Sequence, residues 1–330
     1  MSKKLFLSAL ALACAASCFT GCSERTNSAN AAEKTEKLSI VCTVFPEYDW
    51  IRTILGEHQD EVNVTYLLAN GNDMHSFQPT ADDIIKISSC DIFVCTGGES
   101  EEWTQDVIES AVNKDMKVVN LLDVLGDSAK EEELKDGMQG EEESEEESEE
   151  EVEYDEHVWL SLRNAEVFCE AIENTLSSAD PANSQDYKKN LESYTAELEK
   201  LDSEFEELFN SCGQKTLVFA DRFPFRYFTE DYGLDYYAAF SGCSADTEAS
   251  FNTITFLANK IEELDCNAVF EIETSDGSVA KAVVNNSKNN DCDIVRLNSI
   301  QSVKKSDVEN GVTYLSLMNE NYSLLREHLS

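Results

Sequence analysis

The chain has few basic residues for its length. Its 330 residues include 25 Lys and Arg against 66 Asp and Glu, which gives a formal charge of −41. A nucleic-acid-binding surface needs clustered Lys and Arg to displace counterions from phosphates, so this balance argues against nucleic acid, and equally against anionic lipid headgroups, as partners. Because 42% of the residues are hydrophobic, the chain can still bury a core, and disorder of the whole chain is excluded. Cations are the charged partners that this composition favours.

The sequence also lacks the short motifs of common zinc enzymes and nucleotide-binding proteins. It contains no H-E-x-x-H, no G-x-S-x-G and no P-loop pattern, which leaves a metallohydrolase without support. None of its eleven Cys forms a C-x-x-C pair, so a thiolate zinc site has no support either. The eight Cys beyond Cys22 are widely spaced. Disulfides are one interpretation of them, and buried free thiols, which we favour, are the other.

Long apolar runs are absent beyond the N-terminus. Two lysines precede the apolar residues 5–19, and Cys22 follows a glycine. This pattern predicts a lipoprotein signal over 1–21, with Cys22 as the lipid-modified first residue of the mature chain; plain secretion is the alternative. The polar residues 22–37 have the composition of a flexible tether. We therefore expect an extracytoplasmic protein, anchored by lipid to the outer face of the cell membrane or periplasmic.

Short apolar runs alternate with helical patterns in two stretches of the chain. In the first stretch the predicted strands are 38–44, 62–68, 91–96 and 116–122, and the predicted helices are 49–55, 80–88 and 104–112. In the second stretch the predicted strands are 216–221, 235–240, 267–273 and 292–298, and the predicted helices are 225–232, 250–264, 278–288 and 319–329. This alternation predicts parallel sheets flanked by helices, and thus an α/β protein with two Rossmann-like lobes, 38–182 and 213–330.

A long helical pattern separates the two stretches. Between Asn183 and Ser211 the apolar residues recur at spacings of three and four, and the Asp180-Pro181 pair before them is a helix-start signal. At ~1.5 Å per residue, a helix of some 25 residues within 183–212 would reach roughly 40 Å. We expect it to join the lobes as one rigid rod; an ordinary surface helix is the alternative.

One segment has too little apolar surface to pack. Residues 131–156 hold fourteen Glu, two Asp and one Lys, a local charge of −15. Because charges of one sign at this density repel each other, we expect a disordered acidic loop over 127–154. A solvated loop is the ordinary meaning of such a run. A weak antenna for divalent cations is the alternative, since carboxylate oxygens are hard ligands.

The sequence contains only four histidines, and two of them lie at junctions between predicted elements, where a ligand can bind. His58 and His328 are expected on the surface without a role. His75 lies in a loop between a predicted strand and a predicted helix, and open parallel sheets bind ligands at the carboxyl ends of their strands. His157 lies where the acidic segment meets an apolar run. Taken singly, each is more often a hydrogen-bonded structural residue, but together the two are candidate zinc ligands.

The sequence around both histidines resembles a known family. Met74-His-Ser-Phe-Gln-Pro-Thr80 is similar to the H-x-[YF]-x-P motif of zinc/manganese solute-binding lipoproteins of bacterial ABC importers, and Asp155-Glu-His-Val-Trp-Leu160 to their D-P-H-V-W-L motif. Phe225-Arg-Tyr-Phe228 with Tyr232-Gly-Leu234 resembles the segment that opens their second lobe. The resemblance covers about 38–329. It implies two α/β lobes joined by a long rigid helix, one metal ion in the cleft between them, and a loop rich in His or acids before the second motif.

Two positions depart from the family pattern. The family's third ligand, His or Glu, lies three residues before the Phe of the F-x-Y-F segment; this position holds Arg222, which cannot bind a metal and would repel a dication. Its neighbour Asp221 is the expected substitute. The fourth family ligand is an Asp after the last strand, and the corresponding Asn298 offers only a neutral carbonyl oxygen. The resemblance therefore implies His75, His157, Asp221 and Asn298 as metal ligands, with a weakened set from the second lobe.

Zinc is the ion that this ligand set favours. Imidazole nitrogen suits Zn²⁺, whereas Mn²⁺, the second choice, prefers oxygen-rich sites. Asp155 and Glu156 are expected to orient the imidazole of His157. Because imidazole binds a metal only when neutral, we expect the affinity to fall as the pH drops through about 6.

The resemblance implies transport rather than catalysis. The expected function is capture of zinc outside the cytoplasm and delivery to an ABC permease in the cytoplasmic membrane, by a monomer with a lipid anchor at Cys22. Two alternatives stay open. A degenerate lipoprotein of the same fold, acting as an adhesin or a cation buffer, fits Arg222 and Asn298, and a zinc metallohydrolase is the least favoured.

Overall fold

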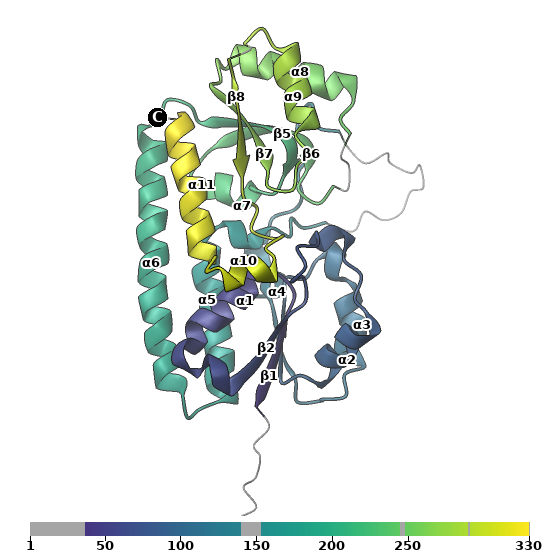
Figure 1. Cartoon of the computed structure of the whole chain (residues 1–330), viewed down its shortest axis with the longest axis vertical. Coiled ribbons are helices and arrows are strands. Elements are labelled where there is room, and N and C mark those ends of the chain that lie inside the picture. Colours follow the sequence, from purple (N-terminus) through teal and green to yellow (C-terminus); the bar gives the residue numbers. More distant parts are fainter. Residues whose placement is uncertain (1–36, 140–152, 245–247, 290, 330) are drawn as a thin grey trace, which may run out of the picture. The chain divides into compact units, whose positions relative to one another are not determined.

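The strands form two parallel sheets that are wound in the same way. A computed structural model of the chain describes residues 37–139, 153–244, 248–289 and 291–329. The first sheet has the strand order β2-β1-β3-β4 and the second the order β6-β5-β7-β8 (Figure 1). The strands are β1 (Leu38–Cys42), β2 (Val62–Tyr66), β3 (Ile92–Cys95), β4 (Lys117–Asn120), β5 (Thr216–Phe223), β6 (Asp235–Ser241), β7 (Ala268–Ile272) and β8 (Asp293–Leu297). The predicted α/β class with two lobes is confirmed.

Helices cover both sheets and bury a central strand of each. β3 and β7 are buried at every residue, as expected for parallel strands with helices on both faces. The helices are α1 (Phe45–Leu55), α2 (Ala81–Ser89), α3 (Trp103–Glu109), α4 (Leu121–Leu125), α5 (Leu162–Ala179), α6 (Ser184–Ser211), α7 (Arg226–Asp231), α8 (Phe251–Glu263), α9 (Ser278–Asn286), α10 (Lys305–Glu309) and α11 (Tyr314–Leu329).

Side-chain caps explain where several elements differ from their predicted bounds. The strand predicted over 116–122 stops at Asn120, because the Asn120 side chain accepts the N–H of Asp123 and starts α4 there. At the start of α2, Thr80 and Asp83 accept each other's backbone N–H groups in a capping box. Local hydrogen bonds of this kind compete successfully with the β propensity of the residues that follow.

The long helix predicted over 183–212 is α6, and it touches elements of both lobes. In Figure 1 it lies beside α5 and α11, and it also contacts α1. Its buried side chains are Tyr187, Tyr194, Leu198, Leu201, Phe205, Leu208 and Phe209. Because α6 contacts α1 and α5 of the first lobe and α11 of the second, it connects the two lobes.

The acidic segment is held by hydrogen bonds where the structure describes it. The Glu132 N–H donates to Glu153 O at 2.8 Å, and the Gln139 N–H donates to a carbonyl of β6 at 2.9 Å. The prediction of a disordered loop over 127–154 is therefore wrong for the described residues on either side of 140–152. The central residues, 140–152, lie outside the described part of the chain.

The described cysteines are free thiols. Seven of the eight, from Cys42 to Cys292, are buried, and Cys243 is partly exposed. The interpretation as small buried hydrophobes is confirmed for the seven buried thiols. Cys243 is the exception, and it lies at the candidate metal site.

The N-terminal predictions fall outside the described residues. The signal over 1–21, the lipid-modified Cys22 and most of the tether lie in the first 36 residues, which the structure does not describe. Within the described ranges, no helix combines the length and the apolar character needed to cross a bilayer. The bounds of the two lobes, 38–182 and 213–330, stay predictions.

Candidate metal site

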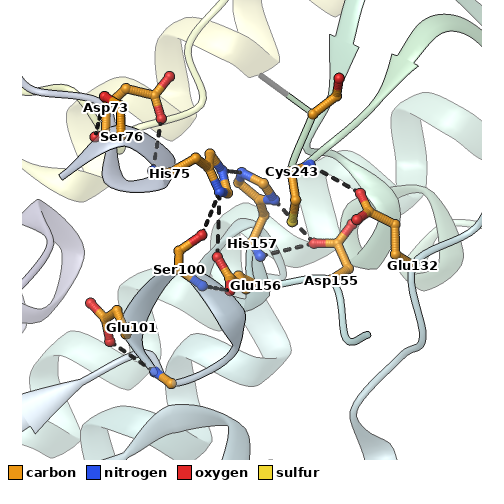
Figure 2. Close-up of polar contacts among 12 residues, drawn as sticks. Asp73, His75, Ser76, Ser100, Glu101, Glu132, Asp155, Glu156, His157 and Cys243 are labelled. Carbon is orange, nitrogen blue, oxygen red and sulfur yellow. Dashed lines mark hydrogen bonds and ion pairs between the residues drawn. The ribbon is translucent and has the colours of Figure 1, made fainter. Parts of the chain in front are cut away.

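The loop between β2 and α2 presents His75. Met74–Ser76 forms a 3₁₀ turn, and Asp73 caps this turn by accepting the His75 N–H at 3.1 Å. On the imidazole, Nδ1 lies 2.8 Å from Ser100 Oγ and 3.4 Å from Glu156 Oε2 (Figure 2). With Nδ1 engaged by these groups, Nε2 is the nitrogen that His75 offers to a ligand.

His157 is fully buried and held by the acidic residue two positions before it. Asp155 Oδ1 accepts the His157 N–H at 2.8 Å and lies 3.1 Å from Nδ1 of the ring. Burial alone would lower the pKa of His157, but the hydrogen bond and charge of Asp155, together with the charges of Glu156 and Glu132, outweigh it and raise the pKa. The ring is therefore oriented with Nε2 away from the carboxylate.

The two imidazoles meet through their Nε2 atoms, which lie 3.1 Å apart. A carboxylate beside Nδ1 favours the tautomer with the proton on Nδ1 and the lone pair on Nε2. Two lone pairs at this distance repel each other unless a proton or a metal ion lies between them. In a tetrahedral zinc site with Zn–N bonds of about 2.0–2.1 Å, two ligand nitrogens lie about 3.3 Å apart. The pair is thus spaced almost as a shared zinc ion requires.

The surroundings of the pair are negative and buried. Asp155 and Glu156 are each no more than 2% exposed. Glu156 Oε1 accepts the Ser100 N–H at 2.7 Å, whereas Oε2 has no hydrogen-bond partner among the described residues. Buried carboxylates cost free energy unless donors or a cation compensate them. A divalent cation at the two Nε2 atoms would supply this compensation.

The second lobe brings a cysteine into the same cluster. Cys243 follows β6, and its Sγ and one nitrogen from each imidazole all lie within 4.8 Å of one another. Gly242 permits this approach, because a Cβ there would lie 3.2 Å from Nδ1 of His157 and 2.9 Å from Phe223 O. Cys243 is not among the ligands that the sequence predicts. Its place just beyond a predicted strand, at the carboxyl end, is the signal that identifies it.

The protonation of Cys243 depends on the same negative surroundings. Burial, followed by the charges of Asp155, Glu132 and Glu156, raises the pKa of its thiol well above the usual value. A nearby dication would act in the opposite direction, since a metal-bound thiol is deprotonated.

The side chains of the two ligands predicted in the second lobe, Asp221 and Asn298, form hydrogen bonds within that lobe. Asp221 lies in β5, where Oδ1 accepts the Arg222 N–H at 2.8 Å and Oδ2 accepts the Ile272 N–H at 3.3 Å. Asn298 Oδ1 accepts the Ile300 N–H at 2.7 Å. These side-chain oxygens are engaged in hydrogen bonds within the second lobe.

Arg222 is neutralised by a residue of the first lobe. Its guanidinium forms an ion pair with Asp73, two residues before His75, and donates to Ser244 O at 3.3 Å. Burial acts to raise the pKa of Asp73, but the charge and hydrogen bond of Arg222 hold it below its usual range. The repulsion of a dication that the sequence predicts for Arg222 is therefore reduced by this pairing.

The other two histidines lie near the surface, as predicted. The ring nitrogens of His58 lie 3.2 Å from Glu61 Oε2 and 3.1 Å from Asp186 Oδ2. With Glu57 and Asp186, His58 forms a second group of closely spaced ligand atoms. Nδ1 of His328 lies 3.7 Å from Asp293 Oδ2. Both rings lie near carboxylates of exposed side chains.

Two α/β lobes, a long connecting helix and a His–His–Cys cluster define a class: a two-lobed metal-binding protein. The sequence model of the ZnuA family, described as zinc-uptake complex component A, periplasmic, matches residues 40–328. The chain therefore belongs to this family, and the resemblance read from the two histidine motifs is confirmed.

Two relatives show how much of the chain is similar to proteins of this family. The zinc-binding lipoprotein AdcA of Streptococcus pneumoniae is 29% identical over 299 residues, which are 90% of this chain and 57% of AdcA. The high-affinity zinc uptake system protein ZnuA of Bacillus subtilis is 27% identical over 319 residues, 95% of each chain. The chain thus spans little more than half the length of AdcA but nearly all of this ZnuA.

Solved structures agree with the fold. The crystal structure of the Zn(II)-bound ZnuA-like domain of Streptococcus pneumoniae AdcA matches with a TM-score of 0.68 at 26% identity, over 89% of this chain and 99% of that domain. The metal-dependent lipoprotein YcdH of Bacillus subtilis matches with a TM-score of 0.71 at 24% identity, over 89% of this chain and all of YcdH. The second likeness shows the fold alone.

Proposed function

We propose that this protein is the zinc-capturing solute-binding component of an ABC importer. The observation that carries the proposal is the His75–His157 pair, whose Nε2 atoms lie 3.1 Å apart while carboxylates flank both Nδ1 atoms. This arrangement has the spacing and the buried negative charge that a zinc ion uses, and the flanking carboxylates favour the tautomers with free Nε2 lone pairs. The protein would bind the ion and release it, without carrying out a reaction.

The named relatives support zinc as the ion. AdcA is described as a zinc-binding lipoprotein and the Bacillus subtilis ZnuA as part of a high-affinity zinc uptake system. The AdcA domain was crystallised with Zn(II) bound. Nitrogen ligands in this chain favour zinc over manganese for the same chemical reason.

His75 and His157 are the ligands in which the proposal is strongest. Asp221 and Asn298 stay predictions, because each would have to give up a hydrogen bond to a backbone N–H before its oxygen reached the ion. A water molecule can complete a tetrahedral set if they do not.

The partners follow from the family and from the N-terminal sequence. We propose that the monomer is attached to the outer face of the membrane through lipid on Cys22 and passes zinc to a permease in that membrane. The family is described as the periplasmic component of an uptake complex. The basic and apolar residues before Cys22 support the lipid anchor.

Zinc titration of histidine variants tests the proposal. In competition with a chromophoric chelator at pH 7.5, His75→Ala combined with His157→Ala should remove the high-affinity site and leave only weak binding by carboxylates. His328→Ala is the matched control, since its ring lies against Asp293 and outside the cluster, and it should bind zinc as the wild type does. Equal affinity in the double variant and the wild type would favour the alternative of a cation buffer or adhesin that binds through its acidic residues.

A further inference from the structure

In the second lobe, Arg222 occupies the position at which the family pattern has a metal ligand. The second lobe nevertheless contacts the site through this residue. Arg222 is paired with Asp73 and donates to Ser244 O. One guanidinium therefore bridges the loop that carries His75 and the loop that carries Cys243. The contact positions both loops without adding a ligand of its own.

Cys243 is held in the cluster by contacts on both sides of it. Its N–H donates to Glu132 Oε1 at 2.9 Å, so a residue of the first lobe anchors the cysteine backbone (Figure 2). The preceding Gly242 has no side chain to separate the loop from the His157 ring. The following Ser244 is held by Arg222. Three consecutive residues are thus fixed, and the middle one carries the thiol.

The distances are close to those of a metal site. In a tetrahedral site, Zn–N bonds near 2.0 Å and a Zn–S bond near 2.3 Å put sulfur and nitrogen about 3.5 Å apart. Cys243 Sγ and one nitrogen of each imidazole already lie within 4.8 Å of one another. Glu156 Oε2, which accepts no hydrogen bond from the described residues, lies buried 3.4 Å from His75 Nδ1.

We propose that Cys243 is the metal ligand of the second lobe, which makes the site a His–His–thiolate site selective for zinc-like dications. The inference rests on the proposed function and deepens it. On binding, the S–H bond of Cys243 breaks, a metal–sulfur bond forms, and the proton passes to solvent, so that no redox change occurs. Because thiolate is a soft ligand, it favours Zn²⁺, Co²⁺ or Cd²⁺ over Mn²⁺.

Cobalt absorption tests the thiolate directly in the wild-type protein. Co²⁺ replaces zinc in such sites, and a bound thiolate adds a sulfur-to-cobalt charge-transfer band in the near ultraviolet. The band should appear in the wild type and in Cys292→Ser, which removes a second-lobe thiol outside the cluster. It should be absent from Cys243→Ser. Because the band is first sought in the unaltered chain, the test does not depend on the folding of a variant.

Metal selectivity gives the second measurement. Cys243→Ser should weaken zinc binding at least about tenfold, since the loss of groups that only support a ligand already costs about 10- to 100-fold. Its affinity for Mn²⁺ should change little, so the preference of the protein for zinc over manganese should narrow. Cys292→Ser should keep both affinities.

The two proposals fail in different ways. If cobalt binds through His75 and His157 but the wild type shows no charge-transfer band, or if Cys243→Ser keeps full zinc affinity, the role of Cys243 is overturned and the zinc-capture function stands. If the double histidine variant binds zinc as well as the wild type does, the proposed function itself fails.

Discussion

Buried carboxylates at the site decide which nitrogen of each imidazole faces the metal. The sequence predicts that Asp155 and Glu156 together orient His157. In the structure they divide the task, because Asp155 lies against Nδ1 of His157 while Glu156, with Ser100, lies against Nδ1 of His75. Two residues adjacent in sequence therefore orient two histidines that are 82 positions apart.

Asp49 shows how one buried carboxyl makes stability depend on pH. It is 6% exposed in α1 and accepts the N–H of Tyr314, the first residue of α11, at 2.8 Å. Burial raises the pKa of Asp49 to about 6, against the opposing effects of this hydrogen bond and of Arg52. The folded protein thus holds the proton more tightly than the unfolded chain does. The contribution of Asp49 to stability is complete below about pH 4 and is lost as the pH rises through about 6.

We expect Asp49→Asn to remove this dependence. Relative to the wild type, the variant should gain about 1 kcal/mol in free energy of unfolding between pH 5 and pH 7.5, measured by urea denaturation. The amide oxygen can still accept the Tyr314 N–H. Asp60→Asn, an exposed control, should follow the wild type at both pH values. A constant difference between Asp49→Asn and the wild type across this range would contradict the raised pKa.

At the scale of elements, α6 holds the molecule together through an aromatic cluster. The ring of Phe205 in α6 lies 5.0 Å from that of Phe228 in α7, 5.4 Å from Tyr232 and 5.2 Å from Tyr322 in α11, measured between centroids. Phe205 is fully buried. One side chain of the connecting helix therefore packs against two helices of the second lobe.

Phe205→Ala should leave a cavity that these neighbours fill only in part. We expect the free energy of unfolding to fall by about 3–5 kcal/mol, the usual cost of removing a buried Phe. Urea denaturation at pH 7.5 measures it. Lys200→Ala, on the exposed side of the same helix, should stay within about 0.5 kcal/mol of the wild type. A loss below 1 kcal/mol for Phe205→Ala would show that α6 does not bury this face in solution.

A comparison of predicted and observed bounds shows which elements the local sequence pattern is sufficient to predict. All eight strands and α6 are predicted within a few residues, because apolar runs and helical spacing belong to the elements themselves. α5 is not among the predicted helices, although its buried residues recur at helical spacings of three and four: Leu162, Ala165, Phe168, Ile172 and Leu176. α11 starts at Tyr314, five residues before its predicted start. Thr313 Oγ1 caps it locally by accepting the Ser316 N–H at 3.1 Å, and Asp49 of α1 accepts the Tyr314 N–H. No local pattern contains that second contact.

At the scale of the whole molecule, hydrogen bonds join residues of the first lobe to the C-terminal part of the chain. Tyr66 Oη donates to Val303 O at 2.9 Å, and Trp159 Nε1 donates to Ser299 O at 2.8 Å. Both donors lie close in sequence to the loops that carry the histidines. An ion that binds ligands from both lobes would add a further connection, and its binding energy would stabilise the folded state.

We therefore expect zinc to raise the melting temperature at neutral pH. At free zinc about 100 times the Kd, the folded state gains about 2.7 kcal/mol, which corresponds to several degrees in a protein of this size. At pH 5 the shift in melting temperature should be much smaller. The pKa of His157 is raised, so protons begin to compete with zinc for its imidazole at a higher pH than usual. Differential scanning fluorimetry with and without a chelator measures both shifts.

The histidine pair accounts for this effect if the site is as proposed. The His75→Ala, His157→Ala variant should show no zinc-dependent shift at either pH. Equal shifts at pH 5 and pH 7.5 in the wild type would mean that groups other than imidazole dominate zinc binding.

The sequence by itself determined the alternation of strands and helices, the long helix α6 and the selection of His75 and His157 as candidate metal ligands. Hydrophobic periodicity and short motifs are local properties, so they can be read along the chain. Only the tertiary structure decided which groups meet: that Nε2 of His75 faces Nε2 of His157, that Arg222 pairs with Asp73, and that Cys243 completes the cluster. Such contacts depend on how two sheets and their loops pack against each other across more than a hundred residues. Spacing along the chain carries no record of that packing.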